Sequence, residues 1–340
     1  MSSKSTVVTV EQPKRPVRLW QRSGLRKASV VLLIVLCITT LIISYLWSRP
    51  PAVFDVSVNA LTLAGDDADR LVPGYATTGA VITVARTLLD KRGGYMSNDI
   101  APPTVFLDNI KNWEYGVLLE LRDVVRALRN DFSRWLTQSA ENADLATADA
   151  QFHFDGSHWI LPSTEDEYRK GIAALEAYLD DLAANQTRFY VRADNLNVYL
   201  ATVEKRLGNL AQRLSENVRD PILRDLLVEG DREISATSHS TPWMEIDDIF
   251  FEARGYVWAV LHILKGIEID FAEQLADKNA DLTLRRIIEK LENTQQALWS
   301  PVTLNSSGFG LFTNHSLVIT SYISRANAAL IDLRLLLTQN

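Results

Sequence analysis

The sequence predicts an all-α protein: a single N-terminal transmembrane helix followed by an extracytoplasmic multi-helix bundle with a coiled-coil-like long helix. Residues 28–47 are uncharged and mostly apolar, and about twenty residues at ~1.5 Å rise each just cross a ~30 Å hydrocarbon core. From residue 77 to the C-terminus, apolar residues recur at the three- and four-residue steps of amphipathic helices. With 340 residues, 47% of them apolar, the chain is long enough to close a large core.

The flanks of the apolar segment predict its orientation. Seven basic residues and one acidic residue precede it, whereas Arg49 is the one base in the first residues after it. By the positive-inside rule, residues 1–27 form a basic cytoplasmic tail, residues 28–47 cross the membrane, and the bulk of the chain lies beyond it. The apolar run is longer than the core of a signal peptide, and residues 44–48 lack a small-x-small cleavage site, which favours an uncleaved anchor over a cleaved signal.

Charge and cysteine content restrict the partners of the outer part. The tail carries +6 of a total charge of −7, so the rest of the chain carries −13. This acidity argues against nucleic acid, and against a broad anionic lipid surface, as a partner. The single cysteine, Cys37, lies in the apolar segment, so the outer part has no disulfide and no thiolate metal ligand.

The elements after the membrane helix follow from turn and capping signals. Residues 48–76 are predicted to form an extended spacer, because Pro50 and Pro51 disfavour a helix. Thr77 or Thr78 can cap the first helix of the bundle. Further helices are expected over residues 112–136, 164–184, 193–214, 242–275, 281–298 and 313–337, with short ones at 141–150 and 222–228. The polar stretch 219–241 is the best hinge and would divide the bundle into a first half, residues 77–218, and a second half, residues 242–340.

Three of these helices have distinctive faces. Residues 193–214 carry a coiled-coil seam that packs either inside its own chain, the favoured alternative, or against a second subunit. The centre of the helix at 242–275 is apolar nearly all round over about ten residues, half of a membrane span, so a buried core helix is predicted and not a second crossing. Helix 112–136 is expected to have a solvated basic face made by Arg122, Arg126, Arg129 and Arg134.

No catalytic, cofactor-binding or metal-binding residue is predicted. The five histidines are not at metal-ligand spacing, and His262 is best explained as a core histidine bonded to a carbonyl or hydroxyl. The loop at 306–310 contains glycines but lacks the Lys-Ser/Thr of a phosphate-binding loop. Glu245, Asp248 and Glu252 share one helix face, where an acidic helix start is favoured over a buried polar network.

Several strings of residues resemble a known family. They are LDKRGGYMSNDI (89–100), RALRNDFSR (126–134), TPWM (241–244), NHSL (314–317) and SRANAALIDLR (324–334). Nearly the whole chain after the tail is similar to the bacterial membrane-anchored family catalogued as domain of unknown function 2333. The resemblance implies a protein of the Gram-negative envelope with a periplasmic location, and it implies no activity and no catalytic residue.

Together these observations predict a non-enzymatic inner-membrane protein whose periplasmic bundle is a scaffold or adaptor, with a protein partner or a second copy bound to its helical faces. The alternative is a periplasmic ligand-binding sensor with a pocket between the two halves, to which Arg254, His262 or the Asn314-His315 corner supplies polar contacts. An enzyme, in the form of a hydrolase that uses carboxylates, ranks third.

Overall fold

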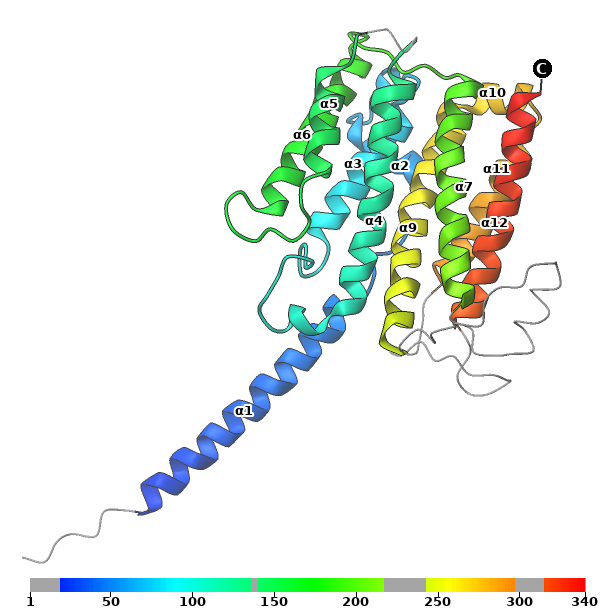
Figure 1. Cartoon of the computed structure of the whole chain (residues 1–340). Helices are drawn as coiled ribbons and strands as arrows, with labels where there is room; N and C mark the ends of the chain where they lie inside the picture. The colour runs from blue at the N-terminus through cyan, green and yellow to red at the C-terminus, as the bar shows by residue number, and fades with distance from the viewer. Residues whose placement is uncertain (1–18, 136–139, 217–242, 297–314, 340) are drawn as a thin grey trace, which may run out of the picture.

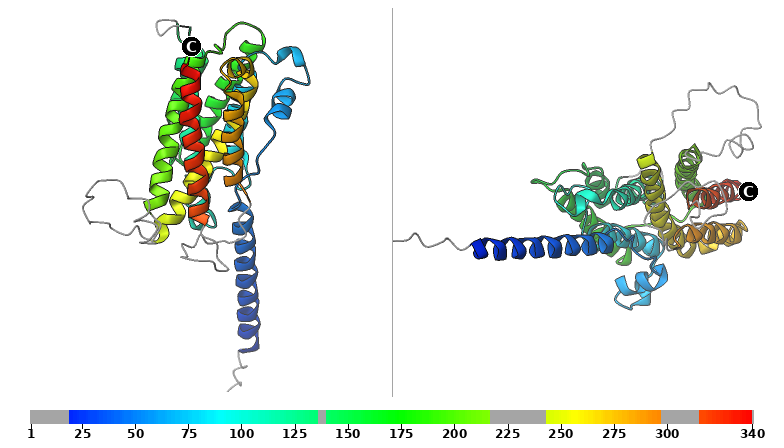
Figure 2. Two further views of the ribbon diagram at one scale, coloured as in Figure 1. Left: turned by 90° about the vertical axis from the view of Figure 1, so that its right-hand side faces the viewer. Right: turned by 90° about the horizontal axis from the view of Figure 1, so that it is seen from below.

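The computed structural model describes residues 19–135, 140–216, 243–296 and 315–339. Within these ranges the regular elements are all helices, which confirms the predicted all-α class. The first helix, α1 (Leu19–Trp47), begins inside the predicted tail and stands away from the body of the molecule (Figures 1 and 2). Its stretch Arg26–Trp47 has a mean hydropathy of 2.7, and its most apolar part is not buried in the body, so by length and composition it could be a membrane anchor or a signal sequence.

The predicted extended spacer is wrong, because residues 48–76 contain two helical elements. Helix α2 spans Val56–Leu63 and the 3₁₀ turn η1 spans Ala68–Arg70. Asp55 is the N-cap of α2: one carboxylate oxygen accepts hydrogen bonds from the backbone N–H groups of Ser57 and Val58 at 2.9 and 3.1 Å. Val56 and Ala60 then lie one turn apart on a buried face, so this segment is part of the packed body.

The body of the molecule consists of long helices joined by loops. Its elements are α3 (Tyr75–Asp90), η2 (Thr104–Phe106), α4 (Asp108–Ala127), the π-helical turn η3 (Leu128–Phe132), α5 (Ala143–Phe152), α6 (Thr164–Ala183), α7 (Ala193–Glu216), α9 (Trp243–Asp270), α10 (Ala272–Asp277), α11 (Asp281–Thr294) and α12 (His315–Thr338). In Figure 1, α5 and α6 lie on one side, α3 and α4 come next, and α9 separates them from α7, α11 and α12. The buried apolar side chains of all these layers form one hydrophobic core.

Helix α9 is the buried centre of this arrangement, as its apolar pattern predicts. It packs against α3, α4, α7 and α11. Each residue from Tyr256 to Leu264 is fully buried. The predicted helix 242–275 is nevertheless interrupted after Asp270, and α10 continues the chain.

Glycines bring α9 into backbone contact with two other helices. A Cβ on Gly255 would lie 2.0 Å from the carbonyl oxygen of Trp113 in α4, and a Cβ on Gly116 would lie 2.0 Å from the carbonyl oxygen of Glu252. Such distances are far below van der Waals contact, so only glycine permits this crossing. A Cβ on Gly266 would similarly approach the Cα of α3 residue Thr77 to 2.8 Å.

The N-terminus of α3 is capped from a distant part of the chain. The N-cap position is Gly74, which has no side chain to cap the helix, and not Thr77 or Thr78 as the sequence suggests. Instead, Asp270 at the end of α9 accepts a hydrogen bond from the backbone N–H of Thr77 at 2.7 Å. The negative charge also lies at the positive end of the α3 dipole.

The leucine-rich seam of α7 is filled by the same chain. Its members Leu196, Leu200, Val203, Leu207, Leu210 and Leu214 are buried. Helices α7 and α12 run side by side (Figures 1 and 2), and Arg334 of α12 donates to Asn197 Oδ1 at 2.9 Å. The favoured alternative for the seam is therefore confirmed. The proposed hinge at 219–241 and the short helix at 222–228 lie outside the described residues.

The glycine crossing makes a first prediction. Gly255→Ala should lower the free energy of unfolding by about 1–3 kcal/mol, because the added methyl group overpacks the contact of α9 with α4. Urea unfolding of the full-length protein in a mild detergent, followed by circular dichroism, measures it. In the matched control Gly208→Ala of α7, the new Cβ meets only the end of the Asn327 side chain at 3.4 Å. That variant should be neutral, or more stable by up to about 1 kcal/mol from helix propensity. Equal stability of the two variants would contradict the role of the crossing.

Candidate functional site

The chain is bound to the centre of the bundle directly after α1, and we call this region the anchor joint (Trp47, Ala52, Phe54, Trp258 and His262). The indole N–H of Trp258 donates to the carbonyl oxygen of Ala52 at 3.3 Å. The backbone N–H of Phe54 donates to Nε2 of His262 at 3.1 Å. Both side chains come from α9, so the buried central helix binds the segment that directly follows α1.

The histidine of the anchor joint is a neutral ring with a defined tautomer. Its Nδ1 lies 2.7 Å from the carbonyl oxygen of Trp258, which can only accept, so Nδ1 carries the proton and Nε2 is free to accept from Phe54. The Phe54 ring stacks on the imidazole with centroids 3.9 Å apart. Burial lowers the pKa of His262 to about 4. The sequence-based interpretation of His262 as a core histidine bonded to a carbonyl is confirmed.

The end of α1 itself packs against the body. Gly93 has a φ of +89°, and a Cβ there would lie 2.8 Å from the Trp47 ring and 2.3 Å from the side chain of Met96. Glycine thus provides both the left-handed backbone and the space for the tryptophan. Trp47 is half-buried against the hydrophobic core.

A hollow of about 600 Å³ lies beside the anchor joint, between residues 49–52 and helix α3. Its lining is mostly polar on the α3 side and includes several bases: Thr83, Arg86, Thr87, Asp90, Lys91 and Arg92. Two of the charged residues are paired with α6, Arg86 with Glu176 at 2.7 Å and Asp90 with Arg169 at 2.8 Å. This hollow does not lie between the two halves of the bundle, and the predicted sensor pocket there stays a prediction.

A buried ion pair fixes the loop that follows α3. Lys91 and Glu114 are in direct contact, with side chains that are almost completely buried. The Glu114 carboxylate also accepts hydrogen bonds from the backbone N–H groups of Met96 and Ser97, each at 2.8 Å, and Lys91 donates to the carbonyl of Gly94. Because every charge is paired and hydrogen-bonded, the pair fixes the loop in one conformation.

A second buried carboxyl group lies between α4, α7 and α9. Glu120 accepts a hydrogen bond from the Tyr199 hydroxyl at 2.5 Å, and its other oxygen has no hydrogen-bond partner within the described residues. Burial raises the pKa of Glu120 to about 8, so the group is protonated at neutral pH. One turn further along α4, Asp123 forms a bidentate ion pair with Arg206 at 2.7 and 3.2 Å.

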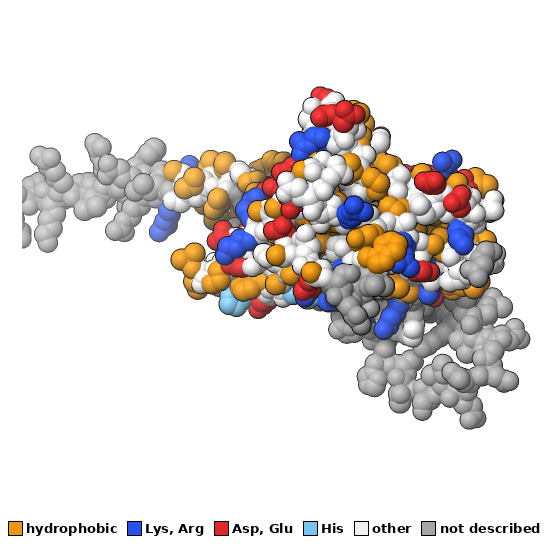
Figure 3. Space-filling model, turned by 90° about the horizontal axis from the view of Figure 1, so that it is seen from above, with side chains coloured by type: hydrophobic (Ala, Val, Ile, Leu, Met, Phe, Trp, Pro, Cys, Tyr) orange, Lys and Arg blue, Asp and Glu red, His pale blue; other side chains and the backbone are white. Residues whose placement is uncertain are grey.

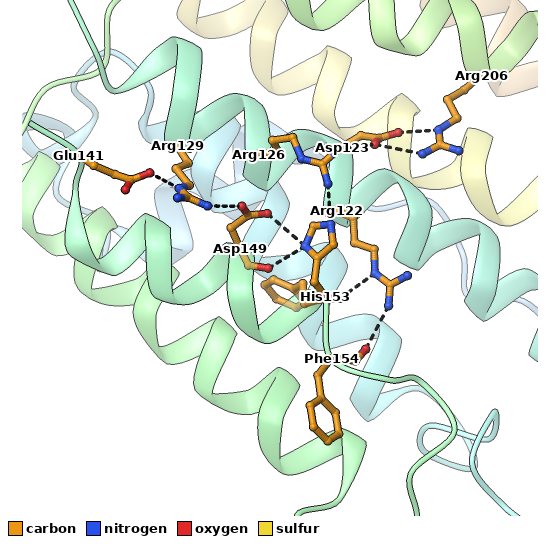
Figure 4. Close-up of polar contacts among 10 residues, drawn as sticks. Arg122, Asp123, Arg126, Arg129, Glu141, Asp149, His153, Phe154 and Arg206 are labelled. Carbon is orange, nitrogen blue, oxygen red and sulfur yellow. Dashed lines mark hydrogen bonds and ion pairs between the residues drawn. The ribbon is translucent and has the colours of Figure 1, made fainter. Parts of the chain in front are cut away.

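The basic face predicted to be solvated is also a contact surface, because Arg122 and Arg126 of α4 and Arg129 of η3 bind α5 and the residues beside it (Figure 4). Arg122 donates to the carbonyl oxygens of Phe152 and Phe154 at 2.7 and 3.1 Å. Arg126 contacts His153 at 2.6 Å, and Arg129 pairs with Asp149 at 2.7 Å and with Glu141. The free carbonyls at the C-terminus of a helix attract cations, which explains the placement of Arg122.

Other residues singled out in the sequence are also engaged in structural contacts. Arg254 is buried and donates to the carbonyl oxygens of Gln295 and Gln296, at 3.4 and 3.2 Å, at the end of α11. Burial lowers the pKa of Arg254 to about 10.

The acidic face of α9, where the sequence favours an acidic helix start over a buried polar network, contacts two neighbouring helices. Glu252 is buried in a bidentate ion pair with Arg213 of α7 at 2.7 and 2.8 Å. Asp248 accepts a hydrogen bond from Asn112 of α4 at 2.6 Å. These two carboxylates thus link α9 to its neighbours. The side chains of Glu245 and His315, together with Asn314, His239 and the loop 306–310, lie outside the description.

The described residues contain no group of three or more His, Cys, Asp or Glu side chains placed to hold a metal ion.

The fold and the anchor joint define a class of protein: an all-α bundle whose central helix binds the chain directly after one N-terminal apolar helix that could span a membrane. The chain belongs to the family described as "uncharacterized protein conserved in bacteria (DUF2333)", whose model matches residues 20–340. No curated protein and no solved structure matches it.

Glu120 makes the stability of the bundle depend on pH. Its folded-state pKa lies above the ordinary value of 4.5, so its contribution is fully present below pH ~4.5 and is lost as the pH rises through about 8. Glu120→Gln mimics the protonated form and should remove this loss. When the pH rises from 5 to 9, the free energy of unfolding of the wild type should fall by on the order of a few kcal/mol more than that of the variant. Urea titrations at both pH values measure it. Glu268→Gln, at a surface ion pair with Arg285, should keep the wild-type slope, and an unchanged slope in Glu120→Gln would refute the assignment.

His262 makes a local prediction at the anchor joint. His262→Leu removes the acceptor of the Phe54 N–H, and the loss of about 1 kcal/mol of hydrogen-bond free energy should speed amide exchange there roughly fivefold. Hydrogen–deuterium exchange of the peptide covering residues 50–56, in the full-length protein, measures it. The control Glu268→Gln breaks an ion pair between α9 and Arg285 of α11 and should leave that peptide unchanged. Unaltered exchange in His262→Leu would show that the joint does not depend on this bond.

Proposed function

We propose that this protein is a membrane-anchored, non-catalytic helical scaffold or adaptor of the bacterial cell envelope, with α1 in the inner membrane and the bundle in the periplasm. One observation carries the proposal: the anchor joint fixes the chain to the buried helix α9 directly after α1. A bundle fixed in this way keeps one orientation relative to the bilayer. Its outer helix faces are then displayed to a partner in constant directions, which is the property that a scaffold requires.

Charge and burial support the individual parts of the proposal. The excess of bases before α1 and of acids after it favours a cytoplasmic N-terminus. The non-catalytic part is supported by the buried groups Lys91, Glu114, Asp123 and His262, because each is bonded to neighbouring elements of the fold.

The proposed topology predicts a labelling pattern. In a Cys37→Ser background, Asp277→Cys at an exposed site of α10 should react with a membrane-impermeant maleimide in intact spheroplasts. Ser5→Cys in the tail should react only after lysis. The opposite pattern would overturn the orientation. Loss of the tail from the mature protein, seen by intact mass, would identify α1 as a cleaved signal.

The scaffold role predicts a complex of defined stoichiometry. The full-length protein is purified from mildly solubilised membranes, and photo-reactive residues replace Val198 of α7 and Leu335 of α12, which are exposed apolar positions. The native mass should exceed that of one chain, and at least one of the two positions should capture the partner that accounts for the extra mass. The same probe at Ile34 of α1 serves as the control for capture by proximity in the membrane. A monomeric mass without capture at either bundle position would contradict the scaffold role.

A further inference from the structure

We infer that two loops at the α1 end of the bundle insert apolar side chains into the interface of the same bilayer that α1 crosses. They are residues 98–107, between α3 and α4, and residues 154–163, between α5 and α6, and we call them the apolar loops. The inference rests on the proposed anchoring by α1. It adds a second, non-covalent contact between the bundle and the lipid.

The apolar loops expose an unusual set of side chains. Six large apolar residues are exposed to solvent: Ile100, Val105, Phe106, Trp159, Ile160 and Leu161. Phe106 is 71% exposed and Leu161 is 88% exposed. Single exposed apolar residues are ordinary, but three on each of two connected loops form a patch of the kind that marks an interaction surface.

Hydrogen bonds fix the two loops in shape and to one another. The buried side chain of Asn98 donates to the carbonyl oxygen of His158 at 3.0 Å and to Glu165 at 2.7 Å. The Tyr95 hydroxyl donates to the carbonyl oxygen of Gly156 at 3.0 Å. The loops are thus held together below their tips, and the exposed apolar side chains are presented by an ordered framework.

The position of the loops relative to α1 points to lipid as the occupant. The first loop begins a few residues after Gly93, which packs against Trp47 at the end of α1. Figure 1 shows both loops on the side of the body toward which α1 runs, the loop between α3 and α4 close to the point where α1 departs and the loop between α5 and α6 at the lower end of those two helices. In Figure 3, hydrophobic side chains gather at the edge of the body beside α1. If α1 crosses a bilayer, this edge faces the lipid headgroups.

The chemistry of the loops indicates apolar insertion and not attraction to anionic lipid. Tryptophan, phenylalanine and aliphatic side chains are those that partition into the membrane interface. The loops also carry acidic residues, Asp99 and Asp155, which disfavour a charge-driven contact with anionic headgroups. Because α1 tethers the loops to the surface, a modest apolar gain is enough to keep them inserted.

Spin labels on single cysteines test the inference in the full-length protein. Phe106→Cys and Ile160→Cys, each in a Cys37→Ser background, are reconstituted into phosphatidylcholine vesicles, and the collision rates with oxygen and with a water-soluble nickel chelate are measured. Leu282→Cys is the matched control, because Leu282 is 61% exposed at the start of α11, at the opposite end of the bundle. Wild-type protein labelled at Cys37 reports on α1.

We expect the ratio of the collision rate with oxygen to that with nickel to be lipid-like at positions 106 and 160. This ratio should be at least severalfold higher than at position 282, and 0.5 M salt should not change it. Water-like ratios at both loops with a lipid-like ratio at Cys37 would overturn the inference and leave the anchor intact. A water-like ratio at Cys37 would overturn the anchor, and the inference with it. Labels that are shielded from nickel in native membranes but not in pure lipid vesicles would assign the loops to a protein partner, which also overturns it.

Discussion

The structure depends on the close crossing of α4 and α9 at Gly116 and Gly255. At this crossing two backbones touch, and no residue type other than glycine fits. The crossing brings Trp113 against Trp258, with ring centroids 5.2 Å apart. Trp258 in turn binds the chain that leaves α1. A packing constraint deep in the bundle therefore determines how the N-terminal helix is attached.

Buried charge has a consistent role around this centre. Glu114 fixes the loop after α3, Asp270 caps α3, and Glu252 joins α9 to α7. Each carboxylate links two different elements of the fold, and each would be costly to leave without its partner. Packing of apolar faces tolerates some sliding between helices, whereas these bonds permit one register. We infer that they specify the arrangement of the helices as much as they stabilise it.

Most of the fold could be predicted from the sequence, because amphipathic periodicity is a local property. Helices α6 and α7 start within a residue of their predicted positions for that reason. The caps of α2 and α3 are harder to predict from the sequence. Asp55 caps a helix of only eight residues with a short apolar face, and Asp270 caps α3 from a distant part of the chain. A signal for the buried carboxylates was present, since Glu114 lies at helical spacing from the buried residues Ile110 and Val117. No local sequence signal predicts the anchor joint, because it pairs residues 208 positions apart.

The place of α9 in the chain has a consequence for biosynthesis. The central helix α9, residues 243–270, is synthesised after α2 to α7. Until then α3 lacks its cap, α4 lacks the partner of Gly116, and the segment after α1 has nothing to bind. The bundle helices that are made earlier must therefore wait with apolar faces uncovered. The core can close only after α9 has been made, and α12, which fills the seam of α7, is made later still.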